Sequence, residues 1–157
     1  MNFGQNLANL LVAAGLSALI GFEREYKKRD AGLRTHIMVG IGAALFTIVG
    51  ADVGAELGMD TTRIAAQVVS GIGFIGAGTI FRAGDNIKGL TTAAGMWTVA
   101  AIGVAAGFGM LLLATTATVV ALLVLFGLLP VVDRIGAKGQ PAQGSEEPDD
   151  NRGDEAR

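Results

Sequence analysis

The side chains that carry most enzyme chemistry are nearly absent from this sequence. It contains no cysteine and a single histidine, His36. Without a thiol, disulfides and cysteine nucleophiles are excluded, and one histidine argues against a zinc site built from protein ligands alone. His36 itself is expected to be a hydrogen-bonded residue at the membrane interface rather than a proton carrier. No nucleophile–base pair can be assembled, so we expect no enzymatic activity, no metal site and no cofactor.

The acidic and basic residues lie at the ends of long uncharged runs rather than inside them. They form two groups, Glu23, Arg24, Arg34, Arg82 and Asp85 near one predicted membrane surface and Asp52, Asp60 and Arg63 near the other. Ionisable residues at mid-depth are the usual sign of an ion path, and Mg²⁺ prefers carboxylates and retained waters. Because the sequence shows no acid-lined route, it argues against an ordinary cation transporter. It does not exclude a transporter whose path is lined by backbone carbonyl groups.

These charges at the membrane edges are placed to form ion pairs between neighbouring segments. We expect Arg63 to pair with Asp52 across one turn. Glu23 is expected to pair with Arg34 or Arg82 at the opposite surface. Such pairs would fix how neighbouring helices are positioned along one another. In the alternative, the charges are unpaired and solvated at the ends of long side chains.

The densest set of glycines lies in the second half of one uncharged run and comprises Gly71, Gly73, Gly76 and Gly78. The first three spell G-x-G-x-x-G, but a dinucleotide fingerprint follows a strand and precedes an acid about 20 residues on. Here residues 64–70, directly before the motif, belong to the same uncharged run as the glycines and do not form a separate strand. We therefore interpret the glycines as small residues that let neighbouring membrane helices approach closely. The alternative is a bent or unwound helix that recruits Gln67, Ser70 and Thr79, as in transporters.

The composition places these residues in a membrane protein. The chain is 51% hydrophobic and 17% charged, whereas soluble domains are about 25% charged. Four uncharged runs are long enough to cross a bilayer, and they cover residues 5–22, 35–51, 64–81 and 89–132. The last run, of 44 residues, is too long for one span and predicts two, at about 91–106 and 110–129. The run of 18 residues at 64–81 would extend about 27 Å as a helix. The sequence thus predicts an all-α, polytopic membrane helix bundle with five transmembrane helices within residues 1–137.

Local signals suggest where these helices begin, end and pack. Asp60 is a plausible N-cap of the third helix, and Thr91 or Thr92 of the fourth. The fourth and fifth helices should separate at the cluster of glycines that comprises Gly103, Gly107 and Gly109. Pro130 should end the last helix. In the first helix a stripe of small residues recurs every fourth position, at Ala13, Ser17 and Gly21.

The distribution of basic residues predicts the orientation. Nine Lys and Arg residues fall on one side of the predicted membrane and Arg63 alone on the other, so the positive-inside rule puts the N-terminus outside and the C-terminus in the cytoplasm. No basic residue precedes the first apolar run, so we expect no signal peptide. Residues 138–157 are rich in Gly, Pro, Ser and acids and are expected to form a disordered acidic cytoplasmic tail. The net charge of −2 suggests no nucleic-acid partner.

Several blocks of sequence, in one order and spacing, resemble the MgtC/SapB family of bacterial inner-membrane proteins. The blocks are Gly21-Phe-Glu-Arg-Glu25, Ala31-Gly-Leu-Arg-Thr-His36, the stretch from Asp60 to Gly78, the stretch Ile87-x-Gly89-Leu-Thr-Thr92, and Trp97. The motif residues taken from the resemblance are Glu23, Arg24, Arg34, Asp60, Arg63, Gln67, Gly71, Gly73, Gly76, Gly78, Gly89, Thr91 and Thr92.

The resemblance implies a compact five-span protein of the bacterial inner (plasma) membrane, linked to growth in low Mg²⁺. It also implies action through membrane-protein partners, with a second copy of the chain as one candidate. Longer members carry a folded cytoplasmic domain after the last span, and this sequence resembles a short form without it. Thr98-Val99 stands where the virulence branch has a cysteine, so virulence-type regulation is not expected. The alternative function is a small ion transporter or channel whose glycine-rich third helix lines the path.

Overall fold

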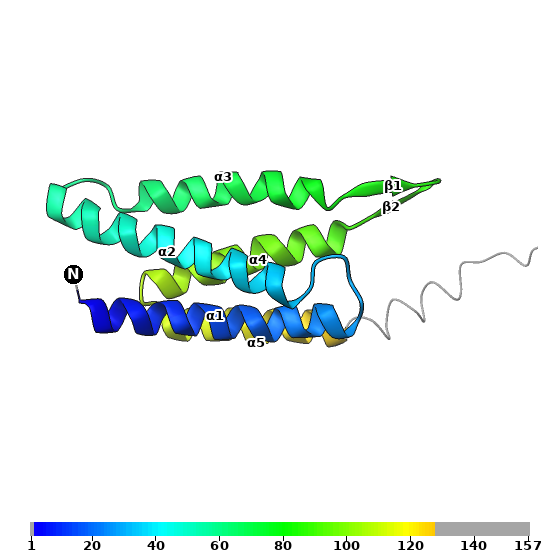
Figure 1. The fold of residues 1–157 in the computed structure, drawn as a ribbon, viewed down its shortest axis with the longest axis horizontal. Helices are drawn as coiled ribbons and strands as arrows, with labels where there is room; N and C mark the ends of the chain where they lie inside the picture. The colour runs from blue at the N-terminus through cyan, green and yellow to red at the C-terminus, as the bar shows by residue number, and fades with distance from the viewer. Residues whose placement is uncertain (1, 128–157) are drawn as a thin grey trace, which may run out of the picture.

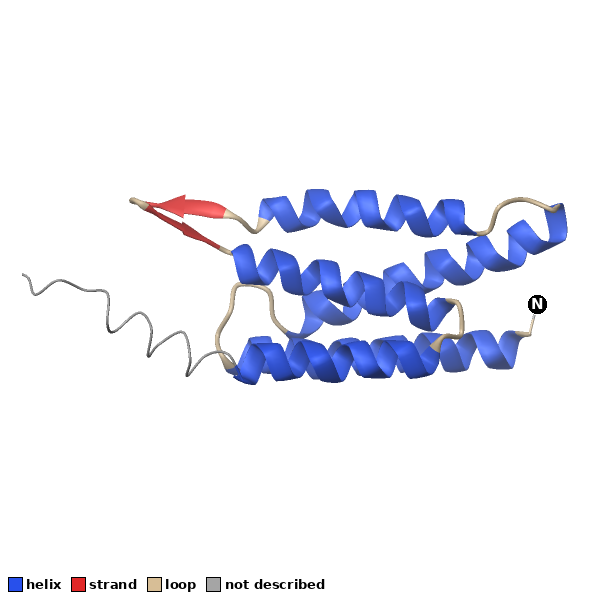
Figure 2. Ribbon diagram, turned by 180° about the vertical axis from the view of Figure 1, so that it is seen from behind, coloured by secondary structure: helices blue, strands red, loops and turns tan. Residues whose placement is uncertain are grey.

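The computed structural model describes residues 2–127 of the protein, and these residues form a bundle of helices (Figure 1). The helices are α1 (Phe3–Tyr26), α2 (Leu33–Leu57), α3 (Thr62–Gly78), α4 (Leu90–Gly107) and α5 (Leu111–Gly127). Two short strands, β1 (Phe81–Ala83) and β2 (Asn86–Lys88), form an antiparallel hairpin between α3 and α4 (Figure 2). The predicted all-α bundle is confirmed. Pro130 and the predicted tail at 138–157 lie outside the described residues.

Helix α4 is the centre of the bundle. It packs against α1, α2, α3 and α5, whereas α3 packs mainly against α2 and α4, and α5 mainly against α1 and α4. In Figure 1 the helices run back and forth along the long axis, with α3 and α5 on opposite sides. The two peripheral helices therefore keep much of their surface free of contacts within the chain.

The lengths and surfaces of the helices are those of a membrane protein. Of the five predicted spans, the helices α1, α2 and α4 are long and apolar enough to cross a membrane, and α5 is a shorter apolar helix. Helix α3, with 17 residues, is not among these candidates. The outer faces carry large apolar side chains that are mostly exposed, such as Leu11 (62%), Phe74 (86%) and Leu112 (83%). In a bilayer these side chains would contact lipid rather than water, which removes the cost of exposing them.

Small residues bring the central helices into close contact. Ala13 and Ser17 of α1 are fully buried, and the hydroxyl of Ser17 lies against Gly40 of α2. On the other side of α2, a Cβ on Gly103 of α4 would lie 2.5 Å from the carbonyl oxygen of Gly40. The predicted stripe on the first helix is confirmed as a packing face, and Gly40 is the point where three helices meet.

The end of α2 and the start of α3 follow ordinary capping rules. Helix α2 ends at Gly58, which has φ 65°, a conformation that suits glycine. The carboxylate of Asp60 then accepts hydrogen bonds from the backbone N–H of Thr62 at 2.9 Å and from its hydroxyl at 2.6 Å. These bonds hold the pKa of Asp60 below its ordinary value. Asp60 therefore contacts the first residue of α3, but the N-cap position predicted for it is occupied by Thr61.

Two predicted boundaries around the hairpin are wrong. The third helix ends at Gly78 rather than at position 81, and Phe81 begins β1. Gly84 has φ 62° in the first position of a two-residue turn, where type II′ hairpins place glycine. Neither Thr91 nor Thr92 caps α4, because the helix already begins at Leu90 and has no side-chain cap. Gly89 precedes it with φ 88°.

The break between the last two helices lies at the predicted glycines, with one difference. Gly109 has φ 76° and turns the chain between α4 and α5. Gly103 and Gly107 instead remain inside α4, and a Cβ on Gly107 would lie 2.8 Å from the carbonyl oxygen of Ala44. Only one glycine of the three makes the turn, and the other two make room for α2.

Candidate functional site

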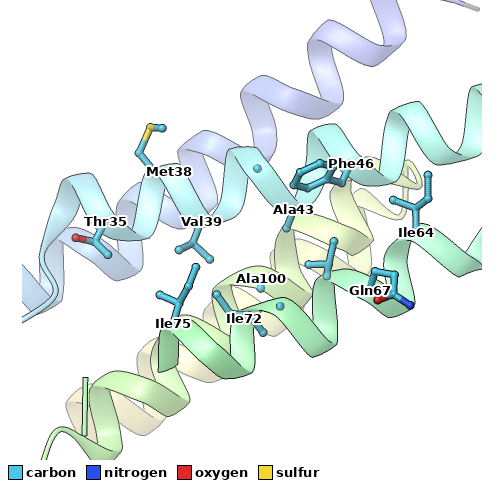
Figure 3. Close-up of a pocket in the computed structure, with 13 residues that line it drawn as sticks. Thr35, Met38, Val39, Ala43, Phe46, Ile64, Gln67, Ile72, Ile75 and Ala100 are labelled. Carbon is cyan, nitrogen blue, oxygen red and sulfur yellow. The ribbon is translucent and has the colours of Figure 1, made fainter. Parts of the chain in front are cut away.

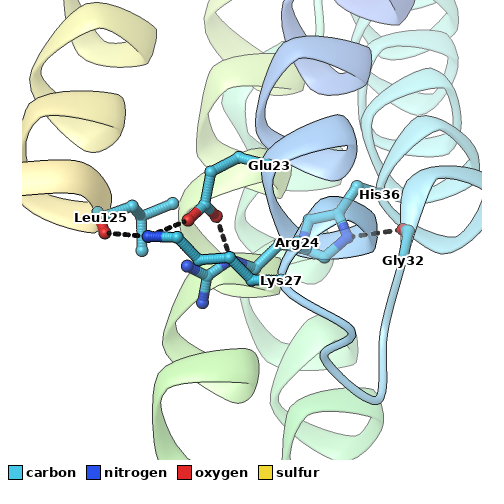
Figure 4. Close-up of polar contacts among 6 residues, drawn as sticks. All are labelled: Glu23, Arg24, Lys27, Gly32, His36 and Leu125. Atoms are coloured by element: carbon cyan, nitrogen blue, oxygen red, sulfur yellow. Dashed lines mark hydrogen bonds and ion pairs between the residues drawn. The ribbon is translucent and has the colours of Figure 1, made fainter. Parts of the chain in front are cut away.

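A cluster of charged side chains is buried where α1 ends. Glu23 and Arg24 are 1% and 2% exposed, and the Glu23 carboxylate pairs with Arg24 and, at 3.0 Å, with the ammonium group of Lys27 (Figure 4). Lys27 also donates to the carbonyl oxygen of Leu125 at 3.2 Å and lies 4.9 Å from the centre of the Phe126 ring. The cluster therefore joins α1 to the last described turn of α5.

These partners are not the ones that the sequence suggested. Glu23 pairs with neither Arg34 nor Arg82: Arg34 is exposed, and Arg82 pairs with Asp85 at 3.6 Å. The physical reason is that α1 continues to Tyr26. One more helical turn places Glu23 and Lys27 on the same face, four residues apart, where side chains meet.

The predicted pair at the opposite end is also wrong. Asp52 accepts a hydrogen bond from the side-chain amide of Asn6 at 2.7 Å, so it joins α2 to α1. Arg63 forms no ion pair with any residue between 2 and 127. It lies in the first turn of α3, and its backbone N–H donates to the carbonyl oxygen of Asp60.

His36 is buried inside the bundle rather than placed at its surface. Its Nδ1 lies 2.8 Å from the carbonyl oxygen of Gly32, but its Nε2 is buried without a hydrogen-bond partner among the described residues. A Cβ on Gly95 of α4 would lie 3.6 Å from Nε2. The expectation of a fully hydrogen-bonded interface residue is therefore wrong for one ring nitrogen. Figure 4 shows His36 on the α2 side of Arg24.

The glycines of α3 do not pack against the rest of the chain as expected. A Cβ on Gly71, Gly73 or Gly78 would meet nothing within 4 Å. Only Gly76 faces a neighbour, with Ala93 at 3.7 Å. The helix is continuous from Thr62 to Gly78, so the alternative of a broken or unwound helix is not observed either. Three of the four glycines are therefore uncovered within the chain. At about 100° per residue, Gly71 and Gly78 lie close together around α3 and Gly73 lies roughly 140–160° away from them, so what we call the open face of α3 is a broad uncovered surface.

An apolar groove of about 680 Å³ runs between α2 and α3 and reaches Ala100 of α4 (Figure 3). Phe46 and Ile64 lie near one end of it, and Ile75 lies near the other. Gln67 supplies an amide to the lining, and Gly71 is part of the wall. Gly71 thus borders the groove, whereas Gly73 and Gly78 lie on α3 outside it.

The remaining predicted site residues fall into separate places. Gly89, Thr91 and Thr92 surround the start of α4, and Arg34 lies exposed in the first turn of α2. Asp60 and Arg63 are at the opposite end of the bundle. Among the predicted residues, only Glu23 and Arg24 meet in a buried cluster.

Three important residues were not singled out from the sequence, namely Lys27, Gly40 and Gly103. Gly103 was noted only as part of a predicted break. A signal for Gly40 was present, because small residues recur along the second run at Gly40, Ala44 and Thr47. Lys27 carried no comparable signal, since its importance depends on α5, almost 100 residues further along the chain.

The comparison with known proteins decides the family. The profile of the MgtC family matches residues 10–134, which is most of the chain. The chain belongs to the MgtC family.

Curated relatives agree with the assignment to the MgtC family. The chain is 50% identical over 125 residues to YhiD of Escherichia coli K12, provisionally named a magnesium transporter, covering 76% of this chain and 58% of that protein. It is 49% identical over 117 residues to Protein MgtC of Brucella abortus strain 2308, covering 74% and 48%. For Protein MgtC of Salmonella typhimurium strain 14028s the identity is 44% over 138 residues, covering 88% and 58%. This MgtC-family chain thus spans about half the length of these relatives. No solved structure matches it.

The arrangement limits the chemistry of this MgtC-family protein. No group of three or more His, Cys, Asp or Glu side chains within residues 2–127 is placed to hold a metal ion. What the described bundle offers instead is a buried ion-pair cluster, an open face of glycines, and an apolar groove. Together with the family and the apolar helices, these features describe an integral bacterial membrane protein.

Proposed function

We propose that this protein acts without enzymatic chemistry, by binding other membrane proteins through α3, in adaptation to low Mg²⁺ or related stress. The observation that carries the proposal is the open face at Gly71, Gly73 and Gly78, where no atom lies within 4 Å of an added Cβ. In lipid, glycines on a helix surface let a second helix approach closely, and packing is the main attraction there. The link to low Mg²⁺ comes from the family resemblance.

The surroundings of this face support a helical partner. Phe74 lies between the glycines and is 86% exposed, so it projects from α3 as a contact for a neighbouring helix. The apolar groove beside Gly71 has a volume of about 680 Å³. Side chains of a partner helix that packs on α3 would have room to enter it.

A pair of matched variants tests the partner surface. Gly73→Leu would place a bulky side chain on the open face, and Gly15→Leu would do the same in α1, where an added Cβ also meets nothing within 4 Å. Both proteins should fold, because the Cβ added at either position meets no neighbouring atom of the chain within 4 Å. In a host strain that lacks the protein, Gly73→Leu should fail to restore growth in Mg²⁺-limited medium, and Gly15→Leu should restore it.

Cross-linking identifies what binds. The chain has no cysteine, so Gly73→Cys and Gly15→Cys each carry a single thiol. In native membranes Gly73→Cys should give a discrete product, at twice the chain mass for a second copy and at another mass for a different protein. Normal growth with Gly73→Leu, together with no product from Gly73→Cys, would rule out α3 as the partner surface.

The second candidate function is ion transport. It is favoured by the buried charges of Glu23 and Arg24, since ionisable residues inside membrane helices commonly mark transport paths, and by the provisional name of the Escherichia coli relative. Because Gly73 and Gly78 of α3 are uncovered within the chain, a path lined by these glycines would lie between two copies of the chain. Mg²⁺ flux into proteoliposomes should then exceed that of empty vesicles and fall in Glu23→Gln. Flux equal to that of empty vesicles would remove this candidate.

A further inference from the structure

A second cavity, of about 530 Å³, lies apart from the buried cluster and the α2–α3 groove. It is formed where the α1–α2 connection, the hairpin and the first turn of α4 meet. Its polar lining residues are Lys28, Arg29, Asp30, Lys88, Thr91 and Thr92. Cavities that hold small ligands measure about 300–1,000 Å³, so this one has room for a molecule the size of a lipid headgroup.

The charged side chains around the cavity favour an anion. Lys28 and Arg29 come from the α1–α2 connection and Lys88 from β2, which brings three positive charges to the lining. Asp30 adds one negative charge, so the net charge of the lining is positive. Lys and Arg side chains can only donate hydrogen bonds, and a ligand that suits them must supply several acceptor oxygens.

The start of α4 adds backbone donors to the same cavity. Gly89 precedes the helix, and no side chain caps it. The first backbone bond of the helix runs from the N–H of Ala93 to the carbonyl oxygen of Gly89. Within residues 2–127, the N–H groups of Leu90, Thr91 and Thr92 therefore have no acceptor. Such free N–H groups, with the positive end of the helix dipole, favour a bound anion.

Thr92 adds a polar side chain to this cavity, in addition to the basic residues and the start of α4. It is 4% exposed and lines the cavity, but its hydroxyl makes no hydrogen bond with any residue that the structure describes. The buried threonines Thr47 and Thr118 differ, because each donates to the carbonyl oxygen four residues earlier, at 2.8 and 2.9 Å. The Thr92 hydroxyl is thus free to form a hydrogen bond with an oxygen atom of a ligand in the cavity.

We propose that the cavity lined by Lys28, Arg29, Lys88 and Thr92 binds a phosphate-bearing anion. The phosphate oxygens accept hydrogen bonds from the basic side chains, the Thr92 hydroxyl and the first N–H groups of α4. The phosphate belongs either to the headgroup of an anionic phospholipid or to a free phosphate. This site is independent of the partner surface on α3.

Binding by the full chain, purified in a neutral detergent, tests the site. The probes are phosphatidylglycerol, with phosphatidylcholine as the neutral reference and native mass spectrometry as readout, and inorganic phosphate, measured by calorimetry. In Arg29→Gln/Lys88→Gln, affinity for the bound probe should fall by about tenfold or more, since each charge-assisted hydrogen bond contributes severalfold. Thr92→Val should also weaken binding. Asp30→Asn should strengthen it, because it removes the opposing negative charge.

The matched control is Arg82→Gln, which removes a basic residue from the same hairpin at a position that does not line the cavity. Its affinity should equal that of the unaltered protein. Phosphatidylglycerol that inorganic phosphate does not displace identifies a lipid headgroup, and displacement or direct phosphate binding identifies a free phosphate. If the double variant does not fold, the two single variants test the site instead. Affinity should rise in Asp30→Asn and fall in Thr92→Val. Equal binding by all variants, or no binding of either probe, would overturn the site.

Discussion

At the scale of single residues, Lys27 has more long-range partners than the sequence suggested. It pairs with Glu23 on its own helix and donates to Leu125 of α5. The motif residues Glu23 and Arg24 lie in the last turns of α1, but the partners predicted for Glu23, Arg34 or Arg82, are wrong. A helix end that shifts by one turn changes which face a side chain occupies, and that shift decided the pairing.

Lys27→Ala should lower the stability of the bundle. The change removes the bond to Leu125 and leaves Glu23 paired only with Arg24, at a cost of about 1 kcal/mol, typical of polar contacts between membrane helices. The measurement is the thermal unfolding midpoint in detergent. Arg34→Ala is the control, because Arg34 is exposed and forms no ion pair among the described residues. Equal midpoints for the two variants would show that the link between α1 and α5 is unimportant.

At the scale of helices, the glycines that matter for folding are not the densest ones. Gly40 and Gly103 lie at the closest approach of α2 and α4, whereas the glycines of α3 face outward. The sequence shows which helices are rich in small residues. It does not show which side of each helix a neighbour covers, because that depends on how the helices are arranged around α4.

Leucine should destabilise the bundle at Gly103 but not at Gly73. Gly103→Leu should reduce yield and stability by about 1–3 kcal/mol or more, because the added Cβ would lie 2.5 Å from the carbonyl oxygen of Gly40. Gly73→Leu should leave both unchanged, which reverses the expectation from the sequence alone. Yield and unfolding midpoint in detergent measure the difference. Destabilisation by Gly73→Leu in the purified monomer would contradict the open face on α3.

The hairpin depends on two glycines in different ways. Gly84→Ala should cost about 1–2 kcal/mol, the backbone penalty for a left-handed residue, since nothing lies within 4 Å of its added Cβ. Gly89→Ala should cost more, because its Cβ would also collide with the carbonyl oxygen of Thr79. Thermal unfolding of the two variants compares these costs. A smaller loss for Gly89→Ala would mean that the chain relaxes easily at the base of the hairpin.

At the scale of the whole molecule, charge divides the bundle into two ends. Within residues 2–127, the α1–α2 connection, the hairpin and the adjoining helix ends carry seven basic residues, and Arg63 alone lies at the other end. This asymmetry agrees with the prediction from the positive-inside rule that the α1–α2 connection and the hairpin lie on the same side of the membrane. It also concentrates positive charge around the proposed phosphate site.

Cysteine mapping in intact cells tests the orientation. The chain has no natural cysteine, so Glu56→Cys and Asp85→Cys each report one end of the bundle. A membrane-impermeant reagent should label Glu56→Cys from outside the cell and reach Asp85→Cys only after the membrane is opened. The reverse order would invert the topology, and labelling of both from outside would contradict the bundle as a membrane-spanning unit.

The sequence by itself determined the class of protein, the order of the helices and most of their boundaries, because the length of apolar runs and the position of charges are local properties. It also located the turn at Gly109 and placed Asp60 within one residue of the N-cap of α3. Only the tertiary structure decided the partners of Glu23, the open face of α3 and the cavity that joins Lys28, Lys88 and Thr92. Each of these depends on segments far apart in the chain. Their contacts follow from how the helices pack around α4, which no local pattern records.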